Sequence, residues 1–231
     1  MKAQRLRLRF GREPEAAGIG HLDLTRTWEL AFQEAGIIVS YSQGNRPQPR
    51  LTLAASLPAG VTSEGELLDA ILAELLHPAE VAQRVRPHLP PGLIVRDVWE
   101  VGMGLPSLPS VMRSADYEVD IPNAEAGPNA ESAVASFLAS ERVPWEDTRG
   151  EKVRRYDLRA LVHDLRVDGV CGESTRLWMR LRCDAAGVGR PDQVVQALGL
   201  PQPIRTHRLR LVLAERSPAH DAWRRRGRFL G

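Results

Sequence analysis

The residues best suited to ligand chemistry gather near the start of the chain. His21 and Asp23 begin a predicted helix, and Gly18 and Gly20 precede them. A helix N-terminus carries free N–H groups and the positive end of the macrodipole, so it attracts phosphate. Taken singly, each residue has a structural interpretation, in which His21 bonds to a neighbouring loop and Asp23 completes the first turn. Grouped with nearby loop residues, they predict an anion or nucleic-acid site.

Those loop residues lie in the segment YSQGNRPQPR at positions 41–50. Its two prolines stiffen the loop, so the polar groups between them are presented in a fixed arrangement. A catalytic version of this site would use His21 and Tyr41 as the base and acid that act on a ribose 2′-OH and its leaving oxygen. The predicted binding residues in the loop are Tyr41, Ser42, Gln43, Arg46 and Arg50.

Arginines alternate with apolar residues along three predicted strands, at 5–10, 175–183 and 206–213. Alternation of this kind is typical of half-buried strands with one arginine-rich face. On an open sheet face, arginine beside an aromatic residue suits phosphate contact and base stacking. The alternatives are a solvated face or a salt-bridged contact between the two halves of the chain. The predicted binding residues on these strands are Arg176, Trp178, Arg180, Arg182, Arg208 and Arg210.

Other candidate sites are weaker. Arg190 precedes a helix start, where Gly187 and Gly189 leave backbone N–H groups accessible to an anion. No metal site is predicted, because His21-x-Asp23 has no matching second pair. The two cysteines are too few for a disulfide framework, and there is no CxxxCxxC motif for an iron–sulfur cluster. We therefore expect no cofactor.

The chain has 231 residues, 43% of them hydrophobic and 26% charged, so it can bury a core as one large or two small domains. The formal net charge is only +2, but residues 1–12 carry five basic side chains and no acid, and 205–231 carry eight arginines and two acids. A codon bias explains the excess of arginine over lysine but not this clustering, which indicates a phosphate-rich partner.

The elements that position these residues repeat in outline. The first half reads as strand, helix, strands, helix, strand, with expected elements at 5–10, 21–35, 37–42, 51–56, 78–89 and 93–101. The stretch 65–75 fits a helix or a strand. The second half has expected elements at 117–121, from 129, 175–183, 191–199 and 206–213. This order predicts an α+β fold of two tandem ferredoxin-like (βαββαβ-type) units with antiparallel sheets.

A connector rich in proline, glycine and serine at 103–110 marks the expected boundary. The predicted domains are 1–104, which holds the candidate site, and 111–214, followed by a basic tail or helix at 215–231. No apolar stretch is long enough to span a membrane, and the N-terminus lacks the apolar region of a secretory signal. We expect a soluble, cytoplasmic protein without a membrane partner.

Four motifs carry a family resemblance: GHLDLTR at 20–26, YSQG at 41–44, PQPRL at 47–51 and GVTSEGE at 60–66. Together they resemble the radical-SAM-linked family of unknown function, which occurs free or fused behind a cobalamin-binding radical-SAM domain. Where the family usually has Phe-Asn-Pro-His-Pro, this chain has Asn45 to Pro49 with neither the aromatic residue nor the histidine. A role for that histidine is therefore not carried over.

The resemblance implies a setting of RNA or translation, because genes of this family often lie beside radical-SAM, ribonuclease and ribosomal-protein genes. The first hypothesis is a non-catalytic protein that binds RNA, of the tRNA or rRNA class, as an adaptor for a radical-SAM enzyme or ribonuclease. The second is a metal-independent endoribonuclease, which resembles CRISPR-repeat-processing enzymes at the level of fold. The third is a protein-interaction partner of a separate radical-SAM polypeptide.

Overall fold

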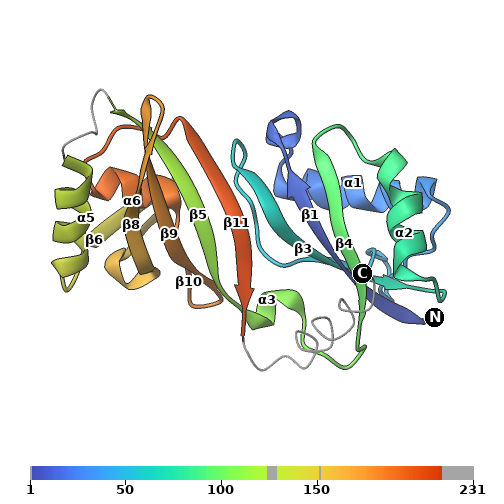
Figure 1. Cartoon of the computed structure of the whole chain (residues 1–231). Helices are drawn as coiled ribbons and strands as arrows, with labels where there is room; N and C mark the ends of the chain where they lie inside the picture. Colours follow the sequence, from blue (N-terminus) through green and yellow to red (C-terminus); the bar gives the residue numbers. More distant parts are fainter. Residues whose placement is uncertain (1, 124–128, 151, 215–231) are drawn as a thin grey trace. The chain divides into compact units, whose positions relative to one another are not determined.

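The computed structural model describes residues 2–123, 129–150 and 152–214, in two compact units (Figure 1). The N-terminal unit contains the described residues up to Met112 together with Leu213 and Ala214, and the C-terminal unit runs from Arg113 to Val212. Both are mixtures of strands and a few helices. The predicted basic segment at 215–231 lies outside the described residues.

In the N-terminal unit the chain order is strand, helix, two strands, helix, strand. The sheet order is β4-β1-β3-β2, and each neighbouring pair is antiparallel. A short helix, α3 (Leu108–Val111), follows β4. The main elements are β1 (Gln4–Arg12), α1 (His21–Glu34), β2 (Leu51–Leu53), β3 (Thr62–Leu72), α2 (Pro78–Val85) and β4 (Leu93–Val101).

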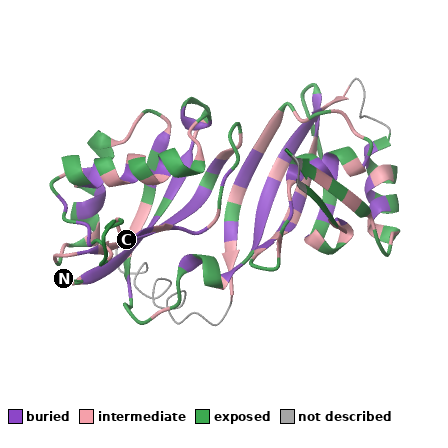
Figure 2. Cartoon of the chain, turned by 180° about the vertical axis from the view of Figure 1, so that it is seen from behind, coloured by how far each residue is buried: buried purple, intermediate pink, exposed green. Residues whose placement is uncertain are grey.

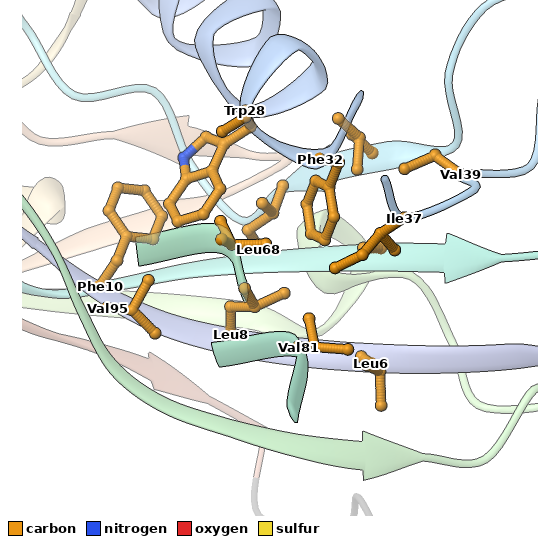
Figure 3. Close-up of a cluster of buried hydrophobic side chains, with 14 of the residues drawn as sticks. Leu6, Leu8, Phe10, Trp28, Phe32, Ile37, Val39, Leu68, Val81 and Val95 are labelled. Carbon is orange, nitrogen blue, oxygen red and sulfur yellow. The ribbon is translucent and has the colours of Figure 1, made fainter. Parts of the chain in front are cut away.

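The two helices cover one face of this sheet and form the core (Figure 3). Trp28 and Phe32 of α1 point toward Leu8 and Phe10 of β1, and the rings of Phe10 and Trp28 meet edge to face at 5.0 Å. Val81 of α2 joins the same buried cluster. The apolar face of the RLRLRF segment is therefore buried as its alternation predicts, and the burial drives the docking of both helices.

The arginine face of β1 differs from the prediction of a half-buried strand. Arg5 and Arg7 are 6% and 4% exposed, and both hydrogen-bond to the carboxylate of Asp69 on β3. Arg5 also donates to the carbonyl oxygens of Leu105 and Pro106. The second face is therefore buried at Arg5 and Arg7, because Asp69 and the segment after β4 accept their hydrogen bonds. Arg9, farther along the same face, stays exposed and pairs with Asp97.

Two further expectations change in this unit. The stretch 65–75, which fitted either element, lies mostly in strand β3. The expected strand at 37–42 is reduced to isolated bridges, at Val39 with Leu72 and at Tyr41 with Pro49. Gly36 has a φ of 65°, the left-handed conformation that glycine supplies after a helix, and it ends α1 as predicted.

The C-terminal unit repeats this order of elements with an inserted hairpin. Its strands are arranged β11-β5-β9, and β8 and the short β10 both pair with the far edge of β9. The hairpin β6-β7 forms a separate two-stranded sheet. The elements are β5 (Met112–Pro122), α5 (Ala130–Ala139), β6 (Pro144–Arg149), β7 (Lys152–Asp157), β8 (Val162–Cys171), β9 (Ser174–Asp184), β10 (Gly187–Val188), α6 (Pro191–Ala197) and β11 (Arg205–Leu213).

Burial along β9 follows the predicted alternation, which Figure 2 displays as alternating colours on the strands. Leu177, Met179 and Leu181 are fully buried, whereas the residues between them are partly exposed. Asn129 stands at the N-cap of α5 as expected, but its side chain makes no capping hydrogen bond. Among the described residues, no helix is long and apolar enough to cross a membrane.

Candidate nucleic-acid interface

The loop at 41–50 is a small hairpin held by its own hydrogen bonds. The N–H of Ser42 donates to the carbonyl of Gln48 at 2.8 Å, and the N–H of Gln48 donates to the Ser42 hydroxyl at 2.9 Å. At its base, the N–H of Arg50 donates to the Ser40 carbonyl at 2.8 Å. The loop therefore presents its remaining side chains from a fixed backbone.

Tyr41 is anchored to α1. Its hydroxyl donates to Oε1 of Glu29 at 2.6 Å, and its side chain remains about half exposed. The hydrogen bond to Glu29, helped by partial burial and the Glu29 charge, raises the pKa of Tyr41 above its ordinary value. A phenol held to a carboxylate in this way is a poor proton donor to a leaving oxygen but offers an aromatic face for stacking.

Three polar side chains of the loop are available to a ligand. Arg50 donates through Nε to the Tyr41 carbonyl at 3.2 Å, and its two terminal amino groups make no hydrogen bond to a described residue. Arg46 and Gln43 are exposed, and Arg46 forms no ion pair with a described residue. The predicted loop residues are thus gathered on one small surface.

The start of α1 makes no hydrogen bond to the loop among the described residues. The segment after α1 turns back alongside the helix. The Ile37 N–H donates to the Phe32 carbonyl, and farther on the Tyr41 hydroxyl donates to Glu29. His21 and Asp23 are exposed, and the His21 imidazole bonds to no described residue. His21 and Glu29 are eight residues apart, about 12 Å along the helix. The structure therefore brings no acid–base pair of His21 and Tyr41 together.

Arg12 fixes the chain that leads into α1. Its side chain is fully buried and donates to the carbonyl oxygens of Ile19 at 2.8 Å and Val61 at 3.0 Å, and also to that of Pro58. These bonds join the segment before α1 to the turn before β3. The position of His21 depends on this buried guanidinium.

The arginine face of β9 is neutralised within its own unit. Asp116 of β5 lies between Arg180 and Arg210 and accepts from the Nε of each at 2.7 Å. Asp120 accepts from Arg176 at 2.7 and 3.0 Å. Arg205 reaches the same carboxylate at 3.3 Å. The predicted binding role of these arginines stays a prediction, but their guanidinium groups already have anionic partners.

The electrostatics of this face follow from those pairs. Burial acts to raise the pKa of Asp116, but the hydrogen bonds from Arg180 and Arg210 outweigh it and leave the pKa below its usual range. The hydrogen bond from Arg176 does the same for the pKa of Asp120. Both carboxylates are therefore charged at neutral pH, and a phosphate approaching this face meets them as well as the arginines.

Trp178 is also engaged. The guanidinium carbon of Arg166 on β8 lies 4.0 Å from its ring centroid, and that of Arg180 lies 5.4 Å away. Arginine over an indole face is an attractive cation–π arrangement. A base that stacks on this face of Trp178 would compete with Arg166.

The remaining predicted arginines are distributed differently. Arg182 bonds to Asp184 at 2.9 Å, and Arg190 lies 3.2 Å from Asp192. Arg208 is 1% exposed and its Nη1 lies 3.5 Å from the Tyr117 hydroxyl, so it is part of the interior. Buried or paired, these side chains contribute less to an accessible cationic surface than their number in the sequence suggests.

The sequence-based prediction of the site omitted two sets of carboxylates, those of β5 and that of Glu29. The carboxylates of Asp116, Glu118 and Asp120 alternate along β5, a signal present in the sequence that predicts neutralisation of a neighbouring arginine strand. No local pattern in the sequence indicates that Glu29 belongs to the site, because its partner Tyr41 lies in the loop after the helix. No cluster of three or more potential metal ligands occurs among the residues that the structure describes.

Comparison with known proteins places the chain in a family. The profile of an uncharacterized protein family conserved in bacteria, DUF2344, matches residues 5–191. The chain belongs to this family. The match covers both the loop and the arginine strand β9. No curated protein matches the chain.

Among solved structures, the chain is similar to one in a crystal structure of a Cbf5-Nop10-Gar1 complex. The two are 9% identical, with a TM-score of 0.47. The similarity covers 89% of this chain and 48% of that one, so this chain spans about half the length of its structural neighbour.

Proposed function

We propose that the chain is a non-catalytic RNA-binding adaptor whose RNA surface is the loop at 41–50 with the adjoining part of α1. The observation that carries this proposal is the contrast between two sets of arginines. Those of β9 are held by carboxylates, whereas Arg46 and the terminal amino groups of Arg50 are unengaged by described residues. A guanidinium that is not held by a carboxylate can neutralise a phosphate and so release the counterions condensed on the RNA, which contributes a large part of the affinity.

The surroundings of the loop support the same proposal. Arg26, on the exposed side of α1, likewise has no ion-pair partner among described residues. Tyr41 adds a half-exposed aromatic face, and Gln43 adds an amide for base edges. Tyr41 is anchored to Glu29, and His21 is exposed with no imidazole hydrogen bond to a described residue, which favours binding over the endoribonuclease hypothesis.

The organisation of the chain fits this role. We propose that each unit is ferredoxin-like, since strand order and element order agree in both. The expected domains at 1–104 and 111–214 belong to this proposal. So do a cytoplasmic location, an RNA of the tRNA or rRNA class, and the link to a radical-SAM enzyme or ribonuclease that the sequence motifs suggest.

The proposal is tested by RNA binding of the full chain and a variant that carries Arg46→Gln and Arg50→Gln. Fluorescence anisotropy with a labelled single-stranded RNA is measured across a range of salt concentrations. The slope of log affinity against log salt is negative, and each lost phosphate contact reduces its magnitude by about 0.7 for a single strand. We expect a lower affinity at low salt and a slope reduced by about 1.4 in the double variant.

A matched control is Arg154→Gln. This arginine of β7 is exposed and has no ion-pair partner among described residues, but it lies in the other unit. We expect it to bind RNA like the unaltered chain. Equal binding by the loop variant and the control, or no binding by the unaltered chain, would contradict the proposal.

A second candidate is the protein-interaction partner, which one observation favours. Leu22 and Leu30 lie on the solvent side of α1 and are 83% and 46% exposed. They are eight residues apart, about two helical turns, so they share a face. The variant Leu22→Gln with Leu30→Gln removes both apolar side chains without adding charge beside the loop, so it is expected to keep RNA binding. Loss of a co-purifying radical-SAM protein or ribonuclease in that variant would support the protein contact, and its retention would oppose it.

A further inference from the structure

A shallow cavity lies beside the loop, between α1 and the segment that follows it. Its volume is about 280 Å³, and its lining residues are Glu29, Gln33, Gly36, Ile37, Ile38, Val39 and Tyr41. Pockets for drug-sized ligands hold about 300–1,000 Å³, so this one suits a single flat ring system. Ile38 and Tyr41, which are 61% and 48% exposed, make it open to solvent.

The walls combine apolar surface with a small number of polar groups. Ile38, Val39 and the Tyr41 ring supply the apolar part, and α1 supplies Glu29 and Gln33 on one side. One oxygen of Glu29 accepts the Tyr41 hydroxyl, while its Oε2 accepts no hydrogen bond from a described residue. A carboxylate has about four lone-pair sites, so Glu29 retains the capacity to accept two further hydrogens.

The charge around the cavity decides which part of a ligand enters it. Glu74 accepts the Ile38 N–H at 2.9 Å, so a second carboxylate is bonded to the backbone of a residue that lines the cavity. This environment disfavours a phosphate and favours a neutral ring that presents hydrogen-bond donors. Among the common bases, guanine carries two adjacent donors on its Watson–Crick edge, the N1–H and the N2 amino group, which match a carboxylate.

A phosphate position lies next to the cavity. Arg50 is held through Nε at the Tyr41 carbonyl, at 3.2 Å, while the Tyr41 side chain lines the cavity. The two terminal amino groups of Arg50 can donate a pair of parallel hydrogen bonds to phosphate oxygens. Tyr41 therefore joins the two positions, because its ring lines the cavity and its carbonyl holds Arg50.

We propose that this cavity is a guanine-binding subsite for single-stranded RNA, with Glu29 accepting from the base, Tyr41 lining it and Arg50 contacting the phosphate. The inference rests on the proposed function and adds a base preference to it. Gln33 completes the site, because its amide can donate to the guanine O6.

The test uses the full chain and labelled undecamers of uridine in which the central residue is guanosine, inosine or adenosine. Inosine lacks only the N2 amino group, so this comparison needs no altered protein. We expect guanosine to bind about tenfold more tightly than inosine or adenosine, within the range for a bidentate base contact. Glu29→Gln should abolish this preference, because an amide cannot accept both hydrogens.

The control variant is Glu34→Gln, which removes an exposed carboxylate of the same helix that does not line the cavity. It should keep the guanosine preference. Equal affinity for the three undecamers, or a preference that survives Glu29→Gln, would overturn the subsite. If those equal affinities still depend on Arg46 and Arg50, the proposed function stands. If no undecamer or longer RNA binds, both fail.

Discussion

Replacement of Asp116 by asparagine tests whether the arginines of the C-terminal sheet serve the fold. The Asp116 side chain is 2% exposed and accepts hydrogen bonds from Arg180 and Arg210. A hydrogen bond to a charged group contributes about 1.5–3 kcal/mol. Arg180 and Arg210 are 34% and 63% exposed, so both cations remain hydrated in the variant and the loss falls at the low end. We expect Asp116→Asn to lower the free energy of unfolding by about 2 kcal/mol.

For a chain of this size, that loss lowers Tm by about 4–8 °C. Thermal and urea unfolding followed by circular dichroism measure it. Asp168→Asn is the control, because its pair with Arg166, at 3.3 Å, joins side chains 37% and 50% exposed. An exposed pair contributes about 0–1 kcal/mol. RNA affinity should not fall in Asp116→Asn, since the change frees two cations. Equal stability of the two variants, or weaker RNA binding by Asp116→Asn, would refute this reasoning.

Three further predictions concern single groups. Arg12→Met should destabilise the chain by about 3 kcal/mol in urea unfolding, because buried carbonyl oxygens lose their donor. The pKa of Asp120 is lowered, first by its hydrogen bond from Arg176, so its stabilising effect is complete above about pH 4 and is lost as pH falls through the lowered value. Asp120→Asn should therefore show a weaker loss of stability between pH 5 and 2, as urea unfolding measures. The absorbance titration at alkaline pH should contain a component above pH 10 that disappears in Tyr41→Phe and moves toward pH 10 in Glu29→Gln.

Much of the architecture could be predicted because local pattern and tertiary burial agree. The apolar positions of β1, α1 and β9 recur with the period of their element, and these residues form the core. The segment 65–75 resisted prediction because its alanine and leucine content favours a helix, whereas its pairing with β1 and β2 makes most of it a strand. The segment 37–42 has the composition of a strand but pairs only at single bridges, since the 41–50 hairpin diverts it.

The sequence predicted which loop residues belong to the site but not which residues they bond to. The prolines and polar residues of 41–50 identified the loop, yet nothing local indicated that Tyr41 is tied to Glu29. For the arginine strands, the alternating pattern is the same whether the opposing strand carries acids or none. The carboxylates of β5 decide the outcome, and they become neighbours of Arg176 and Arg180 only through the antiparallel register of β5 and β9.

The most direct test of the account is hydrogen–deuterium exchange of the full chain, measured by mass spectrometry with and without a bound single-stranded RNA. We expect slower exchange on RNA binding in peptides that cover the loop at 41–50 and the second half of α1, where Glu29 and Gln33 lie. Peptides from β9 and β11 should be unchanged. Protection confined to β9 and β11, with none at 41–50, would contradict the assignment of the RNA surface.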